Sequence, residues 1–253
     1  MKSDSKSGNA DYLLYEKTAE IYDNQRFSGF AGEWGHHRQI SILKKLDQNW
    51  QGKNILEIGC GTGRITEAFA QWGAEVTATD ISKEMLQVAQ HRFSDDRNLP
   101  MPKFRVMSVF DIDTDLQGFD YVIMVNVLGR LSNPREAIQK ISSKISETCR
   151  FIFTFPCLTS ILLPFALIVN VRGKSLARDV TSHWYTPRTI EKYCNDAGLG
   201  IVRWHGNHYV PIPRLLFPTF PLFWVCDSLL AGSFPKRCPS VFVVCKRKPT
   251  DSP

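Results

Sequence analysis

Hydrophobic and polar positions alternate along the chain with two different periods. Apolar residues at helical spacing predict helices over residues 12–22 and 36–46, with a glycine-rich turn at 27–34 between them. Short apolar runs then predict strands over 53–58, 75–79, 103–108, 121–125 and 150–155. Helical patterns follow at 64–72, 82–93 and 134–145. A helix over 187–197 and strands over 200–204 and 240–245 complete the series.

This succession of strands and helices predicts an α/β fold in which helices cover both faces of a parallel sheet. We expect a helical N-terminal cap over residues 1–48 and a larger domain over 49–253. Two apolar insertions, at about 156–186 and 208–239, interrupt the last third of that domain.

The apolar insertions do not have the pattern of membrane spans. Residues 151–171 carry no charge and are long enough for a span, but 151–155 are needed as a strand and two prolines interrupt the remainder. Ligands of open α/β sheets bind outside the carboxyl ends of the strands, and the first insertion leaves its strand at that edge. Three interpretations stay open: extra core, a hydrophobic lid over an apolar substrate, or interfacial membrane contact through 213–217 and 220–224.

Composition narrows the partners and the compartment. The apolar and charged fractions, 43% and 22%, are those of an ordinary soluble globular protein. The net charge of +6 comes without a basic stripe interleaved with aromatics, so nucleic acid is not an expected partner. The seven cysteines form no C-x-x-C and no zinc spacing, which favours a reducing compartment and no metal. Residues 1–10 lack the apolar segment of a secretory signal, and we expect a cytoplasmic protein.

The chemistry-bearing motif is the glycine loop at residues 54–64, NILEIGCGTGR, between a predicted strand and a predicted helix. Glycines at 59, 61 and 63 permit a tight turn and let a ligand lie directly on the backbone. The loop amides and the helix N-terminus then point donors at that ligand. The third glycine comes one residue earlier than in the dinucleotide fingerprint, which disfavours a nicotinamide cofactor. A purely structural turn is the alternative.

Two acidic positions add to this signal. Asp80 ends the second strand, 21 positions after Gly59, where a carboxylate can accept both hydroxyls of a ribose. Its alternative role as a helix cap is already filled by Ser82. Asp111 follows the third strand and is placed to accept a hydrogen bond from an adenine amino group, with Asp113 and Asp115 as nearby alternatives.

These motifs together resemble the class I S-adenosylmethionine-dependent methyltransferases, over roughly residues 12–246. They stand here as LEIGCGTG at 56–63, VTATDIS at 76–82, VFD at 109–111 and FDYVIMVNVL at 119–128. The resemblance implies a doubly wound, mostly parallel seven-stranded sheet, a Rossmann-like methyltransferase fold whose last strand is antiparallel. It also implies that the second insertion springs from the same sheet edge as the first.

The resemblance carries a set of cofactor contacts to this chain. The glycine loop would lie against the methionine portion of S-adenosylmethionine, Asp80 on the ribose, and Phe110 with Asp111 on the adenine. Tyr22-Asp23 looks like the pair that closes over the cofactor carboxylate in the subgroup resembling quinone-biosynthesis methyltransferases. The implied cofactor-binding residues are Tyr22, Glu57, Gly59, Cys60, Gly61, Gly63, Asp80, Ile81, Phe110, Asp111, Asn126 and Val127.

The chain departs from the family pattern in three places. Residues 146–149, SETC, replace the usual Pro-Gly-Gly-type turn before the fifth strand. Gly129-Arg130 stands where many relatives carry histidine. No Asn/Asp-Pro-Pro-Tyr motif follows the fourth strand, which disfavours methylation of a nucleic-acid base amino group.

Catalysis of methyl transfer needs mainly proximity and alignment, and an oxygen acceptor must also lose a proton. Histidine suits that role near neutral pH, and His183, in Ser-His-Trp-Tyr185, is the first candidate base. Tyr185 is a second candidate catalytic residue, and Arg26 and Arg130 are candidates to orient substrate. The remaining candidate bases are His36, His37, His205 and His208. A carbon or nitrogen acceptor would need no dedicated base.

The sequence therefore predicts an S-adenosylmethionine-dependent methyltransferase acting on an apolar or amphipathic small molecule, with oxygen favoured over carbon or nitrogen as the acceptor atom. A monomer or homodimer is expected, with peripheral membrane contact as an open possibility. Two alternatives stay open. One is a methyltransferase of RNA or protein, and the other is a non-catalytic cofactor-binding subunit that activates a partner.

Overall fold

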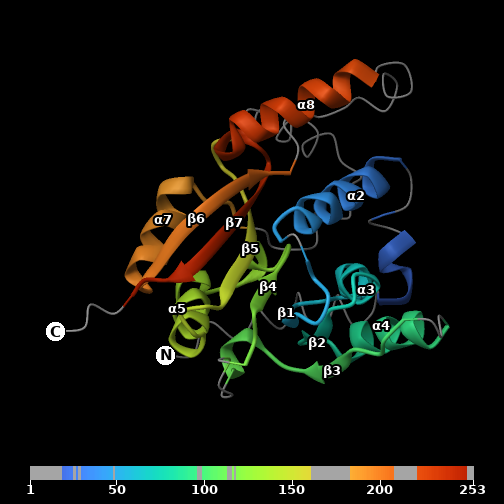
Figure 1. Ribbon diagram of the computed structural model, residues 1–253. Coiled ribbons are helices and arrows are strands. Elements are labelled where there is room, and N and C mark those ends of the chain that lie inside the picture. The colour runs from blue at the N-terminus through green and yellow to red at the C-terminus, as the bar shows by residue number, and fades with distance from the viewer. Residues whose placement is uncertain are drawn as a thin grey trace.

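A computed structural model describes residues 19–24, 27, 30–47, 49–95, 99–112, 116, 118–160, 183–207 and 221–249 (Figure 1). Its centre is one sheet of seven strands in the order β3-β2-β1-β4-β5-β7-β6. The strands are β1 (Asn54–Ile58), β2 (Glu75–Asp80), β3 (Lys103–Val106), β4 (Tyr121–Met124), β5 (Arg150–Pro156), β6 (Leu199–Gly206) and β7 (Ser240–Arg247). The predicted doubly wound α/β sheet is confirmed.

Helices cover both faces of this sheet. One face packs against α2 (Phe30–Lys44), α3 (Arg64–Gln71) and α4 (Lys83–Asp95), through a core that includes Leu43, Phe69 and Leu86. The other face packs against α5 (Pro134–Lys144) and α7 (Pro187–Asp196), through a core that includes Ile138 and Ile190. The remaining elements are α8 (Pro221–Ser233) and the short 3-10 helices η1 (Val109–Asp111), η2 (Leu128–Arg130) and η5 (Pro235–Arg237).

Strand direction places both insertions at one edge of the sheet. Strands β1 to β5 pair in parallel, whereas β7 pairs antiparallel with both β5 and β6. Ser240 at the start of β7 lies opposite Pro156 at the end of β5, and Gly206 at the end of β6 lies opposite Val241. The second insertion therefore leaves and rejoins the sheet at the carboxyl edge, as expected. Helix α8 lies over this edge, at the top of Figure 1.

The N-terminal region differs from its prediction in one respect. The glycine-rich segment expected as a turn is helical from residue 30, so α2 begins six residues earlier than predicted. Glycine weakens a helix by about 1 kcal/mol, which made a turn the better local inference. Packing overrides that local preference, because α2 contributes Ile42 and Leu43 to the core shared with Trp50 and Phe69. The proposed division at residue 48 stays a prediction.

Several predicted features lie outside the described residues: 12–18 of the first helix, Arg26, Asp113, Asp115, His208, and the segments 161–182 and 208–220 that make up most of the two insertions. Within the part of the chain that is described, no helix combines the length and the apolar character that a membrane crossing requires.

Candidate active site

The glycine loop joins β1 to α3 in a tight turn. Gly59 has φ 71°, and a Cβ added to it would overlap Cγ2 of Val127, so no larger residue fits. Gly61 has φ 56°, but no atom lies within 4 Å of its added Cβ. The amides of Gly59 and Cys60 donate to the Thr79 carbonyl at 2.7 and 2.9 Å. The loop is therefore fixed from beneath and presents open backbone at Gly61, next to the N-terminus of α3.

Asp80 ends β2 directly beside this loop. Its carboxylate accepts the Gly61 N–H at 2.8 Å and the Ser82 N–H at 2.9 Å. Burial raises the pKa of this carboxyl above its ordinary value, against the lowering effect of these donors. Ser82 caps α4 as expected, since its hydroxyl accepts the Met85 N–H at 3.2 Å. A carboxylate has about four lone-pair sites, so Asp80 keeps acceptor capacity for ribose hydroxyls.

The adenine end of the predicted site is built by Ile81 and η1. Ile81 follows Asp80 and leaves 50% of its surface exposed, unusual for isoleucine beside a core strand. The Met107 N–H donates to the Asp80 carbonyl at 2.9 Å, and Ser108 caps η1 by accepting the Phe110 N–H at 3.2 Å. Met107 is thereby held beside Asp80, and η1 follows with Phe110 half-buried and Asp111 exposed.

Glu57 lies beneath the loop. Its side chain is 3% exposed and accepts a hydrogen bond from the Thr66 hydroxyl at 2.6 Å. Burial raises the pKa of this carboxyl to about 7, an effect increased by the nearby Asp80. The structure thus places Glu57 as a support under the loop, and its predicted contact with the cofactor stays a prediction.

Asp23 ties the N-terminal segment to the loop. It accepts the Thr62 hydroxyl at 2.6 Å, pairs with Arg92, and lies 3.6 Å from the guanidinium of Arg64. Tyr22, one residue earlier, meets the ring of Phe27 edge-on at 6.0 Å. The predicted Tyr22-Asp23 segment is therefore at the glycine loop, and Asp23 supplies a hydrogen bond and ion pairs that hold it there.

Asn126 and Val127 link the loop to the ends of β4 and β5. Asn126 has φ 61°, a left-handed conformation rare outside glycine, and its N–H donates to the Thr154 hydroxyl at 2.7 Å. Gln39 of α2 donates to the Asn126 side chain at 3.4 Å. Strained backbone of this kind concentrates at functional sites. Asn126 thus stands where the cofactor loop, the cap helix and the sheet edge meet.

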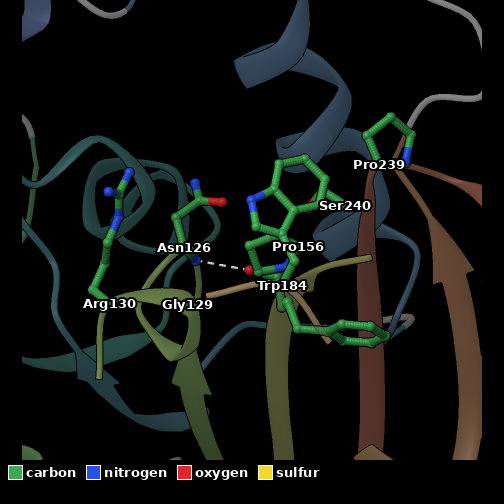
Figure 2. A pocket seen from close by; sticks show the side chains of 9 residues that line it. Asn126, Gly129, Arg130, Pro156, Trp184, Pro239 and Ser240 are labelled. Atoms are coloured by element: carbon green, nitrogen blue, oxygen red, sulfur yellow. Dashed lines mark hydrogen bonds between the residues drawn. The ribbon is translucent and has the colours of Figure 1, made fainter. Parts of the chain in front are cut away.

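A cavity of about 150 Å³ opens beside Asn126, between the ends of β4 and β5 and the start of β7 (Figure 2). Asn126, Arg130, Thr154 and Ser240 give it polar groups, and apolar surface comes from Phe155, Pro156, Trp184 and Pro239. In Figure 2 the side chains of Asn126, Arg130 and Trp184 rise from the sheet edge on the same side. A concave, mixed site of this kind at the carboxyl edge is where ligands of open α/β sheets bind.

His183 precedes the cavity residue Trp184 in the chain; its own side chain is exposed and does not line the cavity. Its N–H donates to the Gly129 carbonyl at 2.7 Å, and its residue neighbour Trp184 lines the cavity. A Cβ on Gly129 would lie 2.8 Å from Pro156 and 3.2 Å from the His183 carbonyl. No side chain therefore fits at position 129, because Pro156 and the backbone of His183 occupy the space.

The other candidate bases lie elsewhere. Tyr185 packs against Tyr193 of α7, with ring centroids 6.4 Å apart, and burial raises its pKa to about 12. His205 is on the edge strand β6, where burial lowers its pKa. His36 is on α2, with its ring 5.9 Å from Phe27, and burial together with Arg64 lowers its pKa to about 4. His37 is exposed on the same helix.

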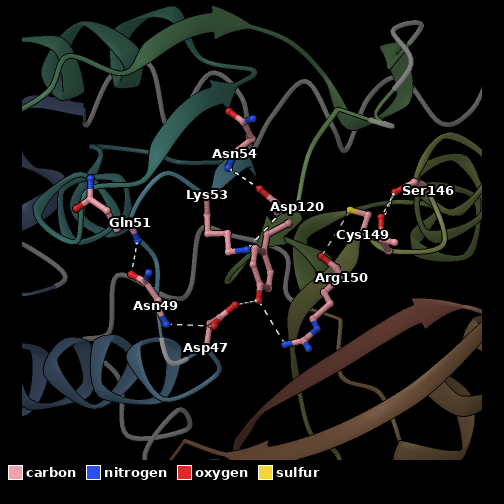
Figure 3. A network of polar contacts seen from close by, with 11 residues as sticks. Asp47, Asn49, Gln51, Lys53, Asn54, Asp120, Ser146, Cys149 and Arg150 are labelled. Carbon is pink, nitrogen blue, oxygen red and sulfur yellow. Dashed lines mark hydrogen bonds and ion pairs between the residues drawn. The ribbon is translucent and has the colours of Figure 1, made fainter.

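A separate polar network holds the opposite, amino edge of the sheet (Figure 3). The Tyr121 hydroxyl donates a hydrogen bond to the Asp47 carboxylate and accepts one from the Arg150 guanidinium at 3.3 Å. The Ser146 hydroxyl accepts the Cys149 N–H at 3.2 Å, so a serine side chain closes the turn before β5. This turn, at residues 146–149, lies at the amino end of β5, whereas the cavity lies at its carboxyl end. We therefore expect the turn to affect the stability of the fold rather than the cavity.

Sequence reasoning missed four residues of the site: Gln39, Arg92, Thr154 and Trp184. Trp184 was within the quoted Ser-His-Trp-Tyr segment, and Thr154 is the position of β5 that faces Asn126. Gln39 and Arg92 are ordinary surface-type residues of helical patterns, and no local signal marked them.

The strand order, the glycine loop and Asp80 beside it are the features of an α/β domain that binds an adenosyl cofactor at the carboxyl edge of its sheet. Comparison with known proteins supports this class. The model of a methyltransferase domain family matches residues 56–151. A ubiquinone biosynthesis O-methyltransferase of Coxiella burnetii is 23% identical over 215 residues, which cover 79% of this chain and 90% of that protein. One from Chromobacterium violaceum is 27% identical over 172 residues, covering 65% and 72%.

Among solved structures, magnesium protoporphyrin IX methyltransferase from Synechocystis PCC 6803 with bound S-adenosylhomocysteine superposes with a TM-score of 0.69 at 18% identity, covering 96% of this chain and 100% of that one. With the methyltransferase-domain match and these similarities, the protein is an S-adenosylmethionine-dependent methyltransferase, and S-adenosylmethionine is its cofactor. The open backbone at Gly61 and the edge position of Asp80 fit that cofactor.

Proposed function

We propose that this protein transfers a methyl group to an aromatic hydroxyl of an apolar or amphipathic small molecule. The observation that carries this proposal is the cavity beside Asn126. Its volume of about 150 Å³ is below that of sites for whole drug-sized ligands and equals a cavity that admits a benzene ring. Phe155, Pro156 and Trp184 supply apolar walls for such a ring. The remainder of an amphipathic acceptor would extend outward from the carboxyl edge of the sheet.

The names of the relatives support the same acceptor class. The proteins from Coxiella burnetii and Chromobacterium violaceum are O-methyltransferases of ubiquinone biosynthesis by name, and the Synechocystis protein is named for a porphyrin. We propose a cyclic, apolar acceptor for this chain by analogy with these names and by the lining of the cavity.

Bound S-adenosylmethionine supplies an activated sulfonium methyl group, so the protein has to place the acceptor in line with it. In the proposed arrangement Trp184 and Phe155 hold the ring, and Asn126 and Arg130 orient its polar substituents. We assign the hydroxyl proton to His183, whose backbone N–H is bonded to Gly129 of the cavity and whose neighbour Trp184 lines it. A positioned general base contributes about 10²–10⁴-fold to rate.

The test combines binding and turnover in purified protein. Calorimetry should show S-adenosylhomocysteine binding, and labelled methyl groups should appear in phenolic acceptors, identified by product mass. His183→Gln should lower kcat by at least about 100-fold while leaving cofactor affinity unchanged. His37→Gln, on the exposed face of α2, is the matched control. Equal turnover in the two variants would remove His183 as the base, and incorporation only into RNA or protein would overturn the acceptor class.

A further inference from the structure

Asn126 has a backbone conformation that residues with side chains rarely adopt. Its φ is 61°, and among the described residues it is the only one other than glycine with a positive φ. Asparagine tolerates this left-handed region better than most residues, but the conformation still costs free energy. The chain adopts it between the end of β4 at Met124 and the start of η2 at Leu128. A contact from outside the strand is therefore needed to hold Asn126 in place.

Thr154 of β5 supplies that contact. Its hydroxyl accepts the Asn126 N–H at 2.7 Å, the bond drawn as a dashed line in Figure 2. Thr154 is 1% exposed, and its backbone is fixed by pairing with Phe242 of β7. The ladder between β4 and β5 ends at Met124 and Phe153, so this side-chain bond connects the two strands beyond the ladder. A hydrogen bond contributes a net free energy comparable to the cost of a left-handed backbone, so the hydroxyl decides which conformation Asn126 adopts.

The conformation of Asn126 affects both the cofactor loop and the cavity. Asn126 and Thr154 line the cavity at the carboxyl edge of the sheet. Val127, the next residue, packs so closely against the glycine loop that a Cβ added to Gly59 would lie 2.3 Å from its Cγ2 atom. Gln39 of α2 donates to the Asn126 side chain at 3.4 Å. A change of φ at Asn126 would therefore displace the support of the cofactor loop together with the wall of the cavity.

We propose that Thr154 is a positioning residue for the cofactor: its hydroxyl holds Asn126 in the left-handed conformation and thereby keeps Val127 against the cofactor loop. The hydroxyl is the group required. Valine has nearly the shape of threonine but offers no acceptor to the Asn126 N–H, whereas serine keeps the acceptor and lacks only a methyl group. The proposal rests on cofactor binding and does not depend on which acceptor is methylated.

The test is calorimetry of S-adenosylhomocysteine binding to the full-length protein and its variants. Thr154→Val should weaken binding by about tenfold or more, because it leaves the Asn126 N–H without its partner. Thr154→Ser should stay within about threefold of the wild-type affinity, since it restores the acceptor. Thr148→Val, in the exposed turn before β5, is the matched control and should leave the affinity unchanged. Thermal unfolding of each variant establishes that it is folded at the temperature of the measurement.

A second background separates positioning from packing. Glycine adopts positive φ readily, so in Asn126→Gly protein the hydroxyl is no longer needed to hold this conformation. Thr154→Val should then cost at most about threefold in affinity, against about tenfold in the wild-type background. An equal loss in both backgrounds would overturn the proposal and assign Thr154 to packing alone. Wild-type affinity in Thr154→Val, or an equal loss in Thr154→Ser, would overturn it as well. Because S-adenosylhomocysteine binds without an acceptor, these results are independent of the proposed acceptor class.

Discussion

Replacing Glu57 with glutamine should stabilise the protein at alkaline pH and remove part of the pH dependence of its folding. Burial raises the pKa of this carboxyl from 4.5 to about 7 in the folded protein. A proton is then bound more tightly by the folded than by the unfolded chain, so stability falls as pH rises from about 4.5 through 7. At 1.36 kcal/mol per pKa unit the full loss is about 3 kcal/mol. Glutamine keeps an oxygen for the Thr66 hydroxyl and carries no charge.

The assay is denaturant unfolding of cofactor-free protein, followed by circular dichroism at several pH values from about 5 to about 8.5. Other groups titrate in the same range, so the quantity that matters is the difference between wild type and Glu57→Gln. That difference should grow by about 3 kcal/mol in favour of the variant across the range. Glu75→Gln, at the exposed start of β2, should run parallel to wild type. Parallel curves for Glu57→Gln as well would refute the reasoning, because they would mean that the carboxyl ionises in the folded state without penalty.

Three further substitutions test the glycine loop, the proposed ribose site and the polar network at the amino edge of the sheet. Gly59→Ala should cost about 1–3 kcal/mol of stability and abolish cofactor binding in calorimetry, whereas Gly118→Ala, with no atom within 4 Å of the added Cβ, should do neither. Asp80→Ala should weaken S-adenosylhomocysteine binding by about 10–100-fold, and an unchanged Kd would show that the ribose lies elsewhere. Tyr121→Phe should lower the free energy of unfolding by about 1–2 kcal/mol, through loss of the contacts to Asp47 and Arg150 in Figure 3, with no change in cofactor affinity.

Much of the cofactor half follows from the order of motifs along the chain. A glycine loop between a strand and a helix has little choice of conformation, because glycines at 59, 61 and 63 all take positive φ. An aspartate at the end of the neighbouring strand must then lie beside that loop, since parallel strands end at one edge of the sheet. The structure places Asp80 in that position, with a hydrogen bond from Gly61.

The N-terminal helical region and the elements over the carboxyl edge of the sheet were harder to predict from the sequence. The start of α2 was predicted too late, because two glycines argue for a turn locally and only the packing of Leu43 and its neighbours outweighs them. The apolar residues of α8 were visible in the sequence, but its contact with α2 was not. That contact depends on Arg38, which lies 190 residues from Ser228 in the chain.

The sequence alone determined the sheet, the cofactor and the edge at which chemistry occurs, because each depends on short-range periodicity or on residues within one strand–loop–helix unit. Tertiary structure decided what faces that edge: Thr154 against Asn126, and the backbone of His183 against Gly129. These are contacts between segments far apart in sequence. Their energies come from burial and hydrogen bonding that no local pattern encodes.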